Sequence, residues 1–292
     1  MKSTNGFTHI GASLLCLALL SSASFAATNP LANPFGMAVD AKGNLWVANG
    51  QGGDSQLGNI LVFNSNYVLQ TKDTITSNLN TPLAVAFDPD GNLWVANNGP
   101  SNGSFDGSVA EYIGGKQNTA ATITNGVLEP FAMAIDGYGD IFVGNQFNYI
   151  TVYETAAALA TPTLAQTLPP SGEGGIAITA GNVLMFGSNS GNTTMTPVLP
   201  VLANGAVDSH YYSGYNGVAL ASDNKGDMYI GNLDGSVYFA LPSQVASLFL
   251  QLSFTPTGIA VDNVHGRVYI SNGPANTIYA YSTAGVLLKT IQ

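Results

Sequence analysis

Few side chains in this sequence have the chemistry expected of a catalyst. The 292 residues include three histidines and one cysteine. His9 and Cys16 lie within the first 26 residues, which have the features of an export signal. After its removal only His210 and His265 remain, which excludes a zinc site with three histidine ligands. The mature chain would also lack a thiol nucleophile and a disulfide.

The N-terminal segment is predicted to be a cleaved signal peptide. Lys2 provides a positive charge, Ile10 to Leu20 is apolar, and Ser24-Phe-Ala26 offers small residues for a cut after Ala26. Leu15 before Cys16 is unsuited to a lipoprotein site. No later segment is long and apolar enough to anchor the chain in a membrane. We therefore expect a secreted or periplasmic protein.

The charge balance excludes some partners. Charged residues are 8% of the chain, with 17 acidic and 7 basic side chains and a net charge of −10. Arg267 is the only arginine. An acidic surface of this kind disfavours nucleic acid and anionic membranes.

A repeated unit is the strongest feature of the sequence. In the second unit, the apolar run Pro82-Leu-Ala-Val-Ala-Phe-Asp88 is followed by Gly91-Asn-Leu-Trp-Val-Ala-Asn97. Six such units occur, and the asparagines that end the second run recur every 40 to 48 residues. These residues are Asn49, Asn97, Asn145, Asn189, Asn232 and Asn272.

This period suits a propeller blade of four short antiparallel strands, which we name a to d. We expect an all-β, six-bladed β-propeller over residues 27–292, as one domain. Strand d of the first blade is expected at Tyr67–Gln70. Ser243–Leu252 could hold a turn of helix, but it is expected to span strand d of blade five. The last blade contains all four of its strands, so we expect the ring to close by side-chain packing without a shared strand.

The loops divide between two faces. The a–b turns are short and uniform, whereas the b–c loops vary in length, so a ligand is expected on the b–c and d–a face, at the mouth of the central channel. The six strand-b asparagines lie on this face. Their amides suit a polar ligand, and they equally suit hydrogen bonds that tie each loop to the backbone.

The aspartates at the a–b turns have a structural interpretation. An Asp side chain in such a turn accepts backbone N–H bonds. Asp88-Pro-Asp-Gly-Asn92 begins like a calcium loop, but the glutamate needed at the twelfth position is absent. We expect turn caps at Asp40, Asp88, Asp136, Asp223 and Asp262.

A second group of candidates precedes the fifth unit. His210 opens the segment His-Tyr-Tyr-Ser-Gly-Tyr-Asn216, and its tyrosines, Tyr215 among them, are suited to stacking on a sugar or an aromatic ligand. Tyrosines of this kind are also common as half-buried strand residues. His265 lies in an a–b turn on the opposite face.

The repeated pattern resembles NHL repeats, and at the same level the senescence-marker/gluconolactonase propellers. The resemblance covers residues 33–292 and implies the fold, although strand b ends in Asn where NHL repeats usually have Asp. Gluconolactonase-type enzymes bind calcium through Glu, Asn and Asp at the channel ends of strand a. Glu173 in Glu-Gly-Gly-Ile and Asn216 in Asn-Gly-Val-Ala resemble two of these ligands.

The third ligand, Asp, has no counterpart here. The matching positions are Phe35, Leu83, Phe131, Glu173 or Gly174, Asn216 and Thr257. Calcium binds six to eight oxygens, so Glu173 and Asn216 are expected to hold at most a weakly bound Ca²⁺ or other divalent cation.

Two functions follow from these observations. The first is a non-catalytic scaffold that binds a small polar ligand or a protein through its loop-rich face, without an assigned catalytic residue and as a monomer. The alternative is a divalent-metal hydrolase of the gluconolactonase type, acting on lactones through Glu173 and Asn216.

Overall fold

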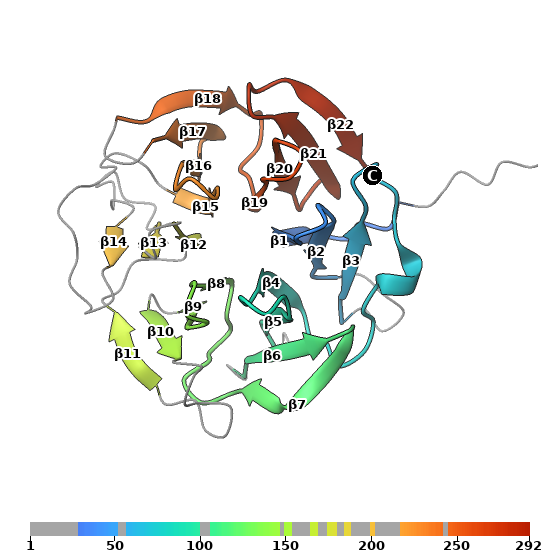
Figure 1. Ribbon diagram of the computed structural model, residues 1–292, viewed down its shortest axis with the longest axis vertical. Helices are drawn as coiled ribbons and strands as arrows, with labels where there is room; N and C mark the ends of the chain where they lie inside the picture. The colour runs from blue at the N-terminus through green and yellow to red at the C-terminus, as the bar shows by residue number, and fades with distance from the viewer. Residues whose placement is uncertain are drawn as a thin grey trace, which may run out of the picture.

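The protein is a β-propeller in which small antiparallel sheets stand around a central axis (Figure 1). The computed structural model describes residues 29–51, 57–99, 106–146, 149–153, 164–168, 174–179, 184–187, 199–201, 217–241 and 245–292. In each sheet the first strand lies next to the axis and the last strand forms the outer rim. Within these ranges, no helix has the length and hydropathy that crossing a membrane requires.

The first half of the chain forms three sheets. Sheet one contains β1 (Pro34–Val39), β2 (Leu45–Asn49) and β3 (Asn59–Phe63). Sheet two contains β4 (Pro82–Phe87), β5 (Leu93–Asn97), β6 (Ser108–Ile113) and β7 (Lys116–Ile123). Sheet three contains β8 (Ala132–Ile135), β9 (Ile141–Asn145), β10 (Tyr149–Tyr153) and β11 (Leu164–Leu168).

The second half forms three more. Sheet four contains β12 (Ile176–Ile178), β13 (Leu184–Phe186) and β14 (Leu199–Val201). Sheet five contains β15 (Gly217–Ser222), β16 (Met228–Asn232), β17 (Ser236–Ala240) and β18 (Ser247–Gln251). Sheet six contains β19 (Gly258–Asp262), β20 (Arg267–Asn272), β21 (Thr277–Ser282) and β22 (Leu287–Ile291).

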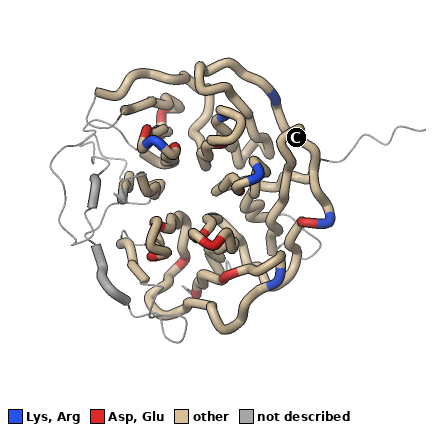
Figure 2. Tube along the Cα trace, in the orientation of Figure 1, with Lys and Arg blue, Asp and Glu red and all other residues tan. Residues whose placement is uncertain are grey.

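In sheets two and five the second strand is the most buried. All five residues of β5 and of β16 are buried, because neighbouring sheets cover both faces of these strands. This explains why the strands are apolar at successive positions and lack the alternation of a half-exposed strand. Charged residues are correspondingly sparse along the described chain (Figure 2).

The expected arrangement of six four-stranded blades is only partly met, because sheets one and four have three strands in the described part of the chain. The prediction of a strand at Tyr67–Gln70 is wrong. Tyr67 has a positive φ of 64°, and Leu69 makes only an isolated bridge to Phe63. The chain then leaves the sheet edge in a short 3₁₀ helix, η1 (Thr71–Asp73).

The prediction that Ser243–Leu252 covers strand d of sheet five is confirmed. Ser247–Gln251, within this segment, is the outer strand β18. It pairs with β17 from Ser236↔Gln251 to Phe239↔Ser247.

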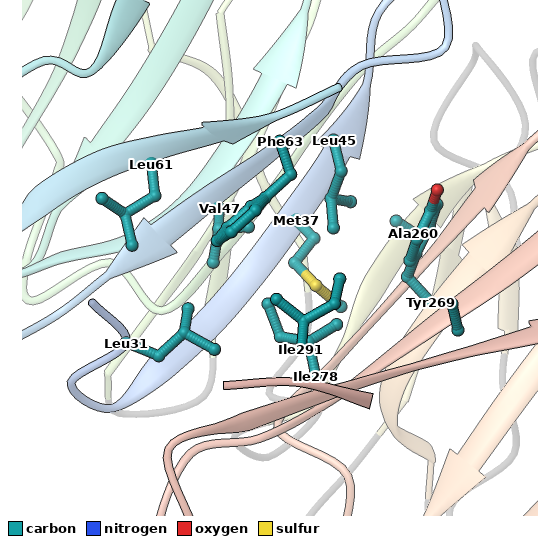
Figure 3. Packing of buried hydrophobic residues seen from close by; sticks show 11 residues of the cluster. Leu31, Met37, Leu45, Val47, Leu61, Phe63, Ala260, Tyr269, Ile278 and Ile291 are labelled. Carbon is teal, nitrogen blue, oxygen red and sulfur yellow. The ribbon is translucent and has the colours of Figure 1, made fainter. Parts of the chain in front are cut away.

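The expectation that no strand is shared at the ring closure is confirmed. All four strands of sheet six come from residues 258–291, and β1 pairs only with β2. The two ends of the chain meet through side chains, with Leu31, Met37 and Leu61 in one core with Ile278 and Ile291 (Figure 3). Burial of this apolar surface stabilises the ring at about 25 cal/mol per Å².

Hydrogen bonds from side chains to the backbone support this packing. The hydroxyl of Thr257 donates to the carbonyl of Pro34 at 2.9 Å, and that of Ser271 donates to the carbonyl of Phe35 at 2.9 Å. At the other face, the guanidinium of Arg267 donates to the carbonyl of Ser65 at 2.7 Å. Sheets six and one are therefore held together at both ends of the interface.

Candidate functional site

A cavity of about 260 Å³ lies on the axis of the propeller. It is lined from all six inner segments of the chain. Each inner strand contributes an apolar residue at an equivalent position, and these six residues are named the apolar ring. They are Met37, Val85, Met133, Ile176, Leu220 and Ile259.

The cavity belongs to the face with the b–c and d–a loops. Its remaining lining comes from the beginnings of the inner strands, from the d–a connection Thr255–Thr257, and from Leu233, which directly follows β16. This is the face on which the sequence placed a ligand. The a–b turns lie at the opposite ends of the same strands.

The upper layer of the lining is asymmetric. At the position two residues before the apolar ring, sheets one to three have Phe35, Leu83 and Phe131, whereas sheets four, five and six have Gly174, Val218 and Thr257. Phe35 and Phe131 line the cavity, and the ring of Phe131 also lies against Gly144. The aromatic side chains of the described lining therefore come from sheets one and three, and sheets four to six contribute none to it.

The polar side chains of the lining are already engaged. Thr255 Oγ1 donates to the carbonyl of Leu233 at 2.6 Å. Thr257 Oγ1 donates to Pro34 and accepts the N–H of Gly273 at 3.0 Å. No ionisable side chain occurs among the described residues of the lining. The described lining is thus electrically neutral.

Backbone strain occurs at this mouth. Three residues that each precede a strand-initiating proline have a positive φ: Asn33 at 57°, Thr81 at 53° and Glu129 at 43°. Residues before proline favour extended conformations, and a β-branched residue such as Thr81 rarely has a positive φ. Strained residues persist where the surrounding structure over-determines them, and they concentrate at ligand sites.

The strand-b asparagines make a repeated structural contact. In the first three sheets, each Oδ1 accepts the backbone N–H of the residue 17 positions earlier, in the preceding d–a loop. Asn49 accepts from Ala32 at 2.6 Å, Asn97 from Asn80 at 3.1 Å, and Asn145 from Leu128 at 2.8 Å. These amides bind the chain itself and fix the loops that surround the cavity.

The fifth and sixth sheets depart from this pattern. Asn232 donates to Ser236 Oγ at 3.1 Å, and its Oδ1 is buried without a partner in the described chain. Asn272 accepts the N–H of Ala275 at 3.3 Å. None of the five described asparagines lines the cavity.

The other sequence-predicted site residues lie outside the described part of the chain, and their predictions stand as made. They are Glu173, Asn216, Tyr215, His210 and Asn189. Among the residues that the structure describes, no three His, Cys, Asp or Glu side chains are grouped so that they could hold a metal ion.

The prediction that the aspartates cap the a–b turns is confirmed. Asp40, Asp136 and Asp223 each accept the N–H groups two and four residues later at 2.8 to 2.9 Å. Asp88 accepts the N–H of Asn92, and Asp262 accepts those of Val264 and His265.

Two of these aspartates also hold a tryptophan. The Oδ2 of Asp40 accepts Trp46 Nε1 at 3.1 Å, and Asp88 does the same for Trp94. Burial raises the pKa of Asp40, but hydrogen bonds from Asn44, Trp46 and Lys42 outweigh it, so this pKa lies below its ordinary value.

His265 is on this opposite face, as predicted. Its Nδ1 lies 2.8 Å from Oδ2 of the fully buried Asp262. The ring also lies against the a–b turn of sheet one, at Gly43. His265 therefore joins sheets six and one, at the end of the channel away from the cavity.

Sequence reasoning missed the aromatic side of the mouth. Phe35 and Phe131 appeared only as positions where metal ligands were absent. The available signal was their recurrence two residues before the apolar ring, but the sequence does not show that the two side chains reach the same cavity.

The fold and the site define the class, a β-propeller with an axial cavity whose described lining is neutral. The sequence matches no family model and no curated protein. Among solved structures, a gluconolactonase from Xanthomonas campestris is similar, with a TM-score of 0.62, 12% identity, and coverage of 84% of this chain and 85% of that one.

Two further structures are similar. A streptogramin B lyase has a TM-score of 0.59 and 14% identity, with 91% of this chain and 84% of that chain covered. The hydrazine synthase of Kuenenia stuttgartiensis has a TM-score of 0.56 and 14% identity, with 90% and 99% covered. At these identities the similarity shows the propeller fold alone.

Proposed function

We propose that this protein is an exported, non-catalytic binding propeller that takes its ligand at the channel mouth on the loop-rich face. The signal peptide ends at Ala26, and residues 27–292 form one six-bladed propeller of the NHL kind. The protein acts as a monomer and binds neither nucleic acid nor membranes. An intact mass of the exported protein that retained Lys2 and Cys16 would contradict the export proposal.

One observation carries the binding function, namely that the described lining of the cavity holds no ionisable side chain. General acid–base catalysis needs a titratable group within hydrogen-bonding distance of the reacting atoms. A hard cation needs several oxygen ligands, usually with more than one carboxylate. The described lining is neutral and its hydroxyls are engaged, so it suits binding better than acid–base or metal-dependent catalysis.

The second candidate is a calcium-dependent lactone hydrolase. It is favoured by the motifs around Glu173 and Asn216, which precede the inner strands of neighbouring sheets four and five. A single carboxylate beside an amide would hold a cation only weakly.

The two functions are separated by comparing the purified wild type with the Glu173→Gln variant. Metal content, calorimetric calcium titration and hydrolysis of simple lactones are measured for both. The binding function predicts no tightly bound metal and no turnover by either protein. Tight calcium binding and lactone hydrolysis by the wild type, both lost in the variant, would establish the hydrolase instead.

A further inference from the structure

Resting on the proposed binding function, we infer that the channel mouth takes a small, uncharged ligand with an apolar ring, which lies against Phe35 and Phe131. This differs from the small polar ligand expected from the sequence. The inference follows from the charge, the hydrogen-bonding capacity, the asymmetry and the size of the cavity.

The lack of an ionisable side chain in the described lining selects against an ionic ligand. A charged group that leaves water needs a partner of opposite charge or several hydrogen bonds. Asp234, the nearest acid in sequence to the lining residue Leu233, is occupied elsewhere. Its Oδ1 accepts both the N–H and the hydroxyl of Ser236, and these bonds lower the pKa of Asp234.

The hydroxyls of the lining select against a polyol. A sugar brings several hydroxyl groups, each of which needs a partner when it is buried. The hydroxyls of Thr255 and Thr257 already donate hydrogen bonds to the carbonyls of Leu233 and Pro34. Side-chain donors for a ligand are therefore absent from the described lining, and the remaining polar partners are backbone groups.

Backbone groups of the lining are engaged as well. The N–H of Gly175 donates to the carbonyl of Gly217 at 3.1 Å, and the carbonyl of Gly175 accepts the N–H of Gly187 at 2.9 Å. Gly258 packs against sheet one, since a Cβ there would lie 2.3 Å from the carbonyl oxygen of Phe35. A ligand at the described lining is therefore held mainly through its apolar part, which faces Phe35 and Phe131.

The aromatic side is held in place by the strained backbone. Asn33 and Glu129 have positive φ values two residues before Phe35 and Phe131, and each is followed by a proline that fixes the next φ. The two phenylalanines thus begin from a constrained backbone, which lowers the entropy lost when a ligand orders them.

The cavity volume limits the ligand to a small molecule. Sites for drug-sized ligands usually have volumes of about 300 to 1,000 Å³, and this cavity is slightly smaller, at about 260 Å³. One ring system with a short substituent fits this size better than an extended chain or a peptide.

The test uses the neutral fluorescent probe 1-naphthalenemethanol, which has one fused ring system and a short substituent, with the full mature chain. Binding is measured by titration, and displacement is compared for benzyl alcohol, benzoate and benzylamine, which share a ring and differ in charge. We expect the probe to bind and benzyl alcohol to displace it at least about tenfold better than either ion, since a tenfold change corresponds to the loss of roughly one good contact.

Variants locate the binding. Phe35→Ala and Phe131→Ala are expected to weaken probe binding about tenfold each, because aromatic anchors dominate such sites. Phe131→Tyr retains the ring and is expected to bind within about threefold of the wild type. Phe249→Ala is the matched control, since Phe249 lies on the outer strand β18 and its removal should leave binding unchanged. Thermal unfolding of each variant verifies that it is folded.

The inference is overturned if the probe does not bind, if either ion displaces it as well as benzyl alcohol, or if both alanine variants bind like the wild type. Binding of a sugar or an ion at this mouth, without turnover, would also overturn the inference while leaving the binding function in place. Calcium-dependent lactone hydrolysis would instead refute the proposed function itself.

Discussion

Asp227 occupies a position where the first two sheets place an asparagine. In those sheets, Asn44 and Asn92 donate Nδ2 to Oδ2 of the turn aspartate at 2.8 and 3.1 Å. In sheet five the backbone contact is the same, with Asp227 N donating to Asp223 Oδ1 at 2.9 Å. Two carboxyl groups therefore meet where the turns of sheets one and two have a carboxylate and an amide.

The pKa of Asp227 is raised for this reason. Burial contributes most, followed by the negative charge of Asp223, while Lys225 opposes the shift. A raised pKa in the folded state means that folding favours the protonated form. The stability from this group is complete below the unfolded pKa of 3.8 and is lost as pH rises through the higher folded pKa.

The Asp227→Asn variant should therefore be more stable than the wild type at pH 7. It replaces a carboxylate pair with a hydrogen bond to a charged acceptor, which contributes about 1.5 to 3 kcal/mol when buried. The turn lies near the surface, so we expect a gain of about 1 kcal/mol, or a rise in Tm of roughly 2 to 4 °C.

The assay is thermal unfolding at pH 7 and at pH 3. At pH 3 the protonated Asp227 can itself donate to Asp223, so the gain should shrink. The reverse change in sheet two, Asn92→Asp, should lower Tm at pH 7 and recover part of the loss at pH 3. An unchanged or lower Tm for Asp227→Asn at pH 7, or an equal gain at both pH values, would refute the reasoning.

Three further variants test the packing of the ring by urea unfolding. Asn145→Ala should lower stability by about 2 kcal/mol because it leaves the N–H of Leu128 unpaired; a loss below about 0.5 kcal/mol would contradict a loop-fixing role. Gly258→Ala should cost about 1 to 3 kcal/mol, since a Cβ there would lie 2.3 Å from the carbonyl oxygen of Phe35; unchanged stability would disprove this close approach. Arg267→Lys should cost about 1 kcal/mol, because the guanidinium lies 4.9 Å from the Tyr67 ring centre while donating to Ser65; a variant as stable as the wild type would show that the bridge contributes nothing.

Local interactions made the inner parts of the fold predictable. Leu93–Asn97 is a strand with the expected bounds, because its apolar residues are buried on both faces in any propeller. The aspartate of each a–b turn bonds to N–H groups at most four residues away, so the turn sequence alone specifies the contact.

The outer rim was less predictable, because it depends on pairing with the rest of a sheet. Tyr67–Gln70 has β-forming residues, but Asn64 Oδ1 accepts the N–H groups of Asn66 and Val68, and this local turn replaces a regular hairpin. Ser247–Gln251 has no clear alternation, yet it becomes a strand because β17 presents an unpaired edge to it.

The sequence by itself determined the repeat, the inner strands, the capped turns and the face with the variable loops, since each depends on residues close together in the chain. Only the tertiary structure decided the chemistry of that face. It turned the amides of Asn49, Asn97 and Asn145 toward loop N–H groups, and it brought Phe35 and Phe131 to one cavity. The physical reason is that closure of the ring brings distant segments to one axis, where burial rather than residue type selects the side chains left for a ligand.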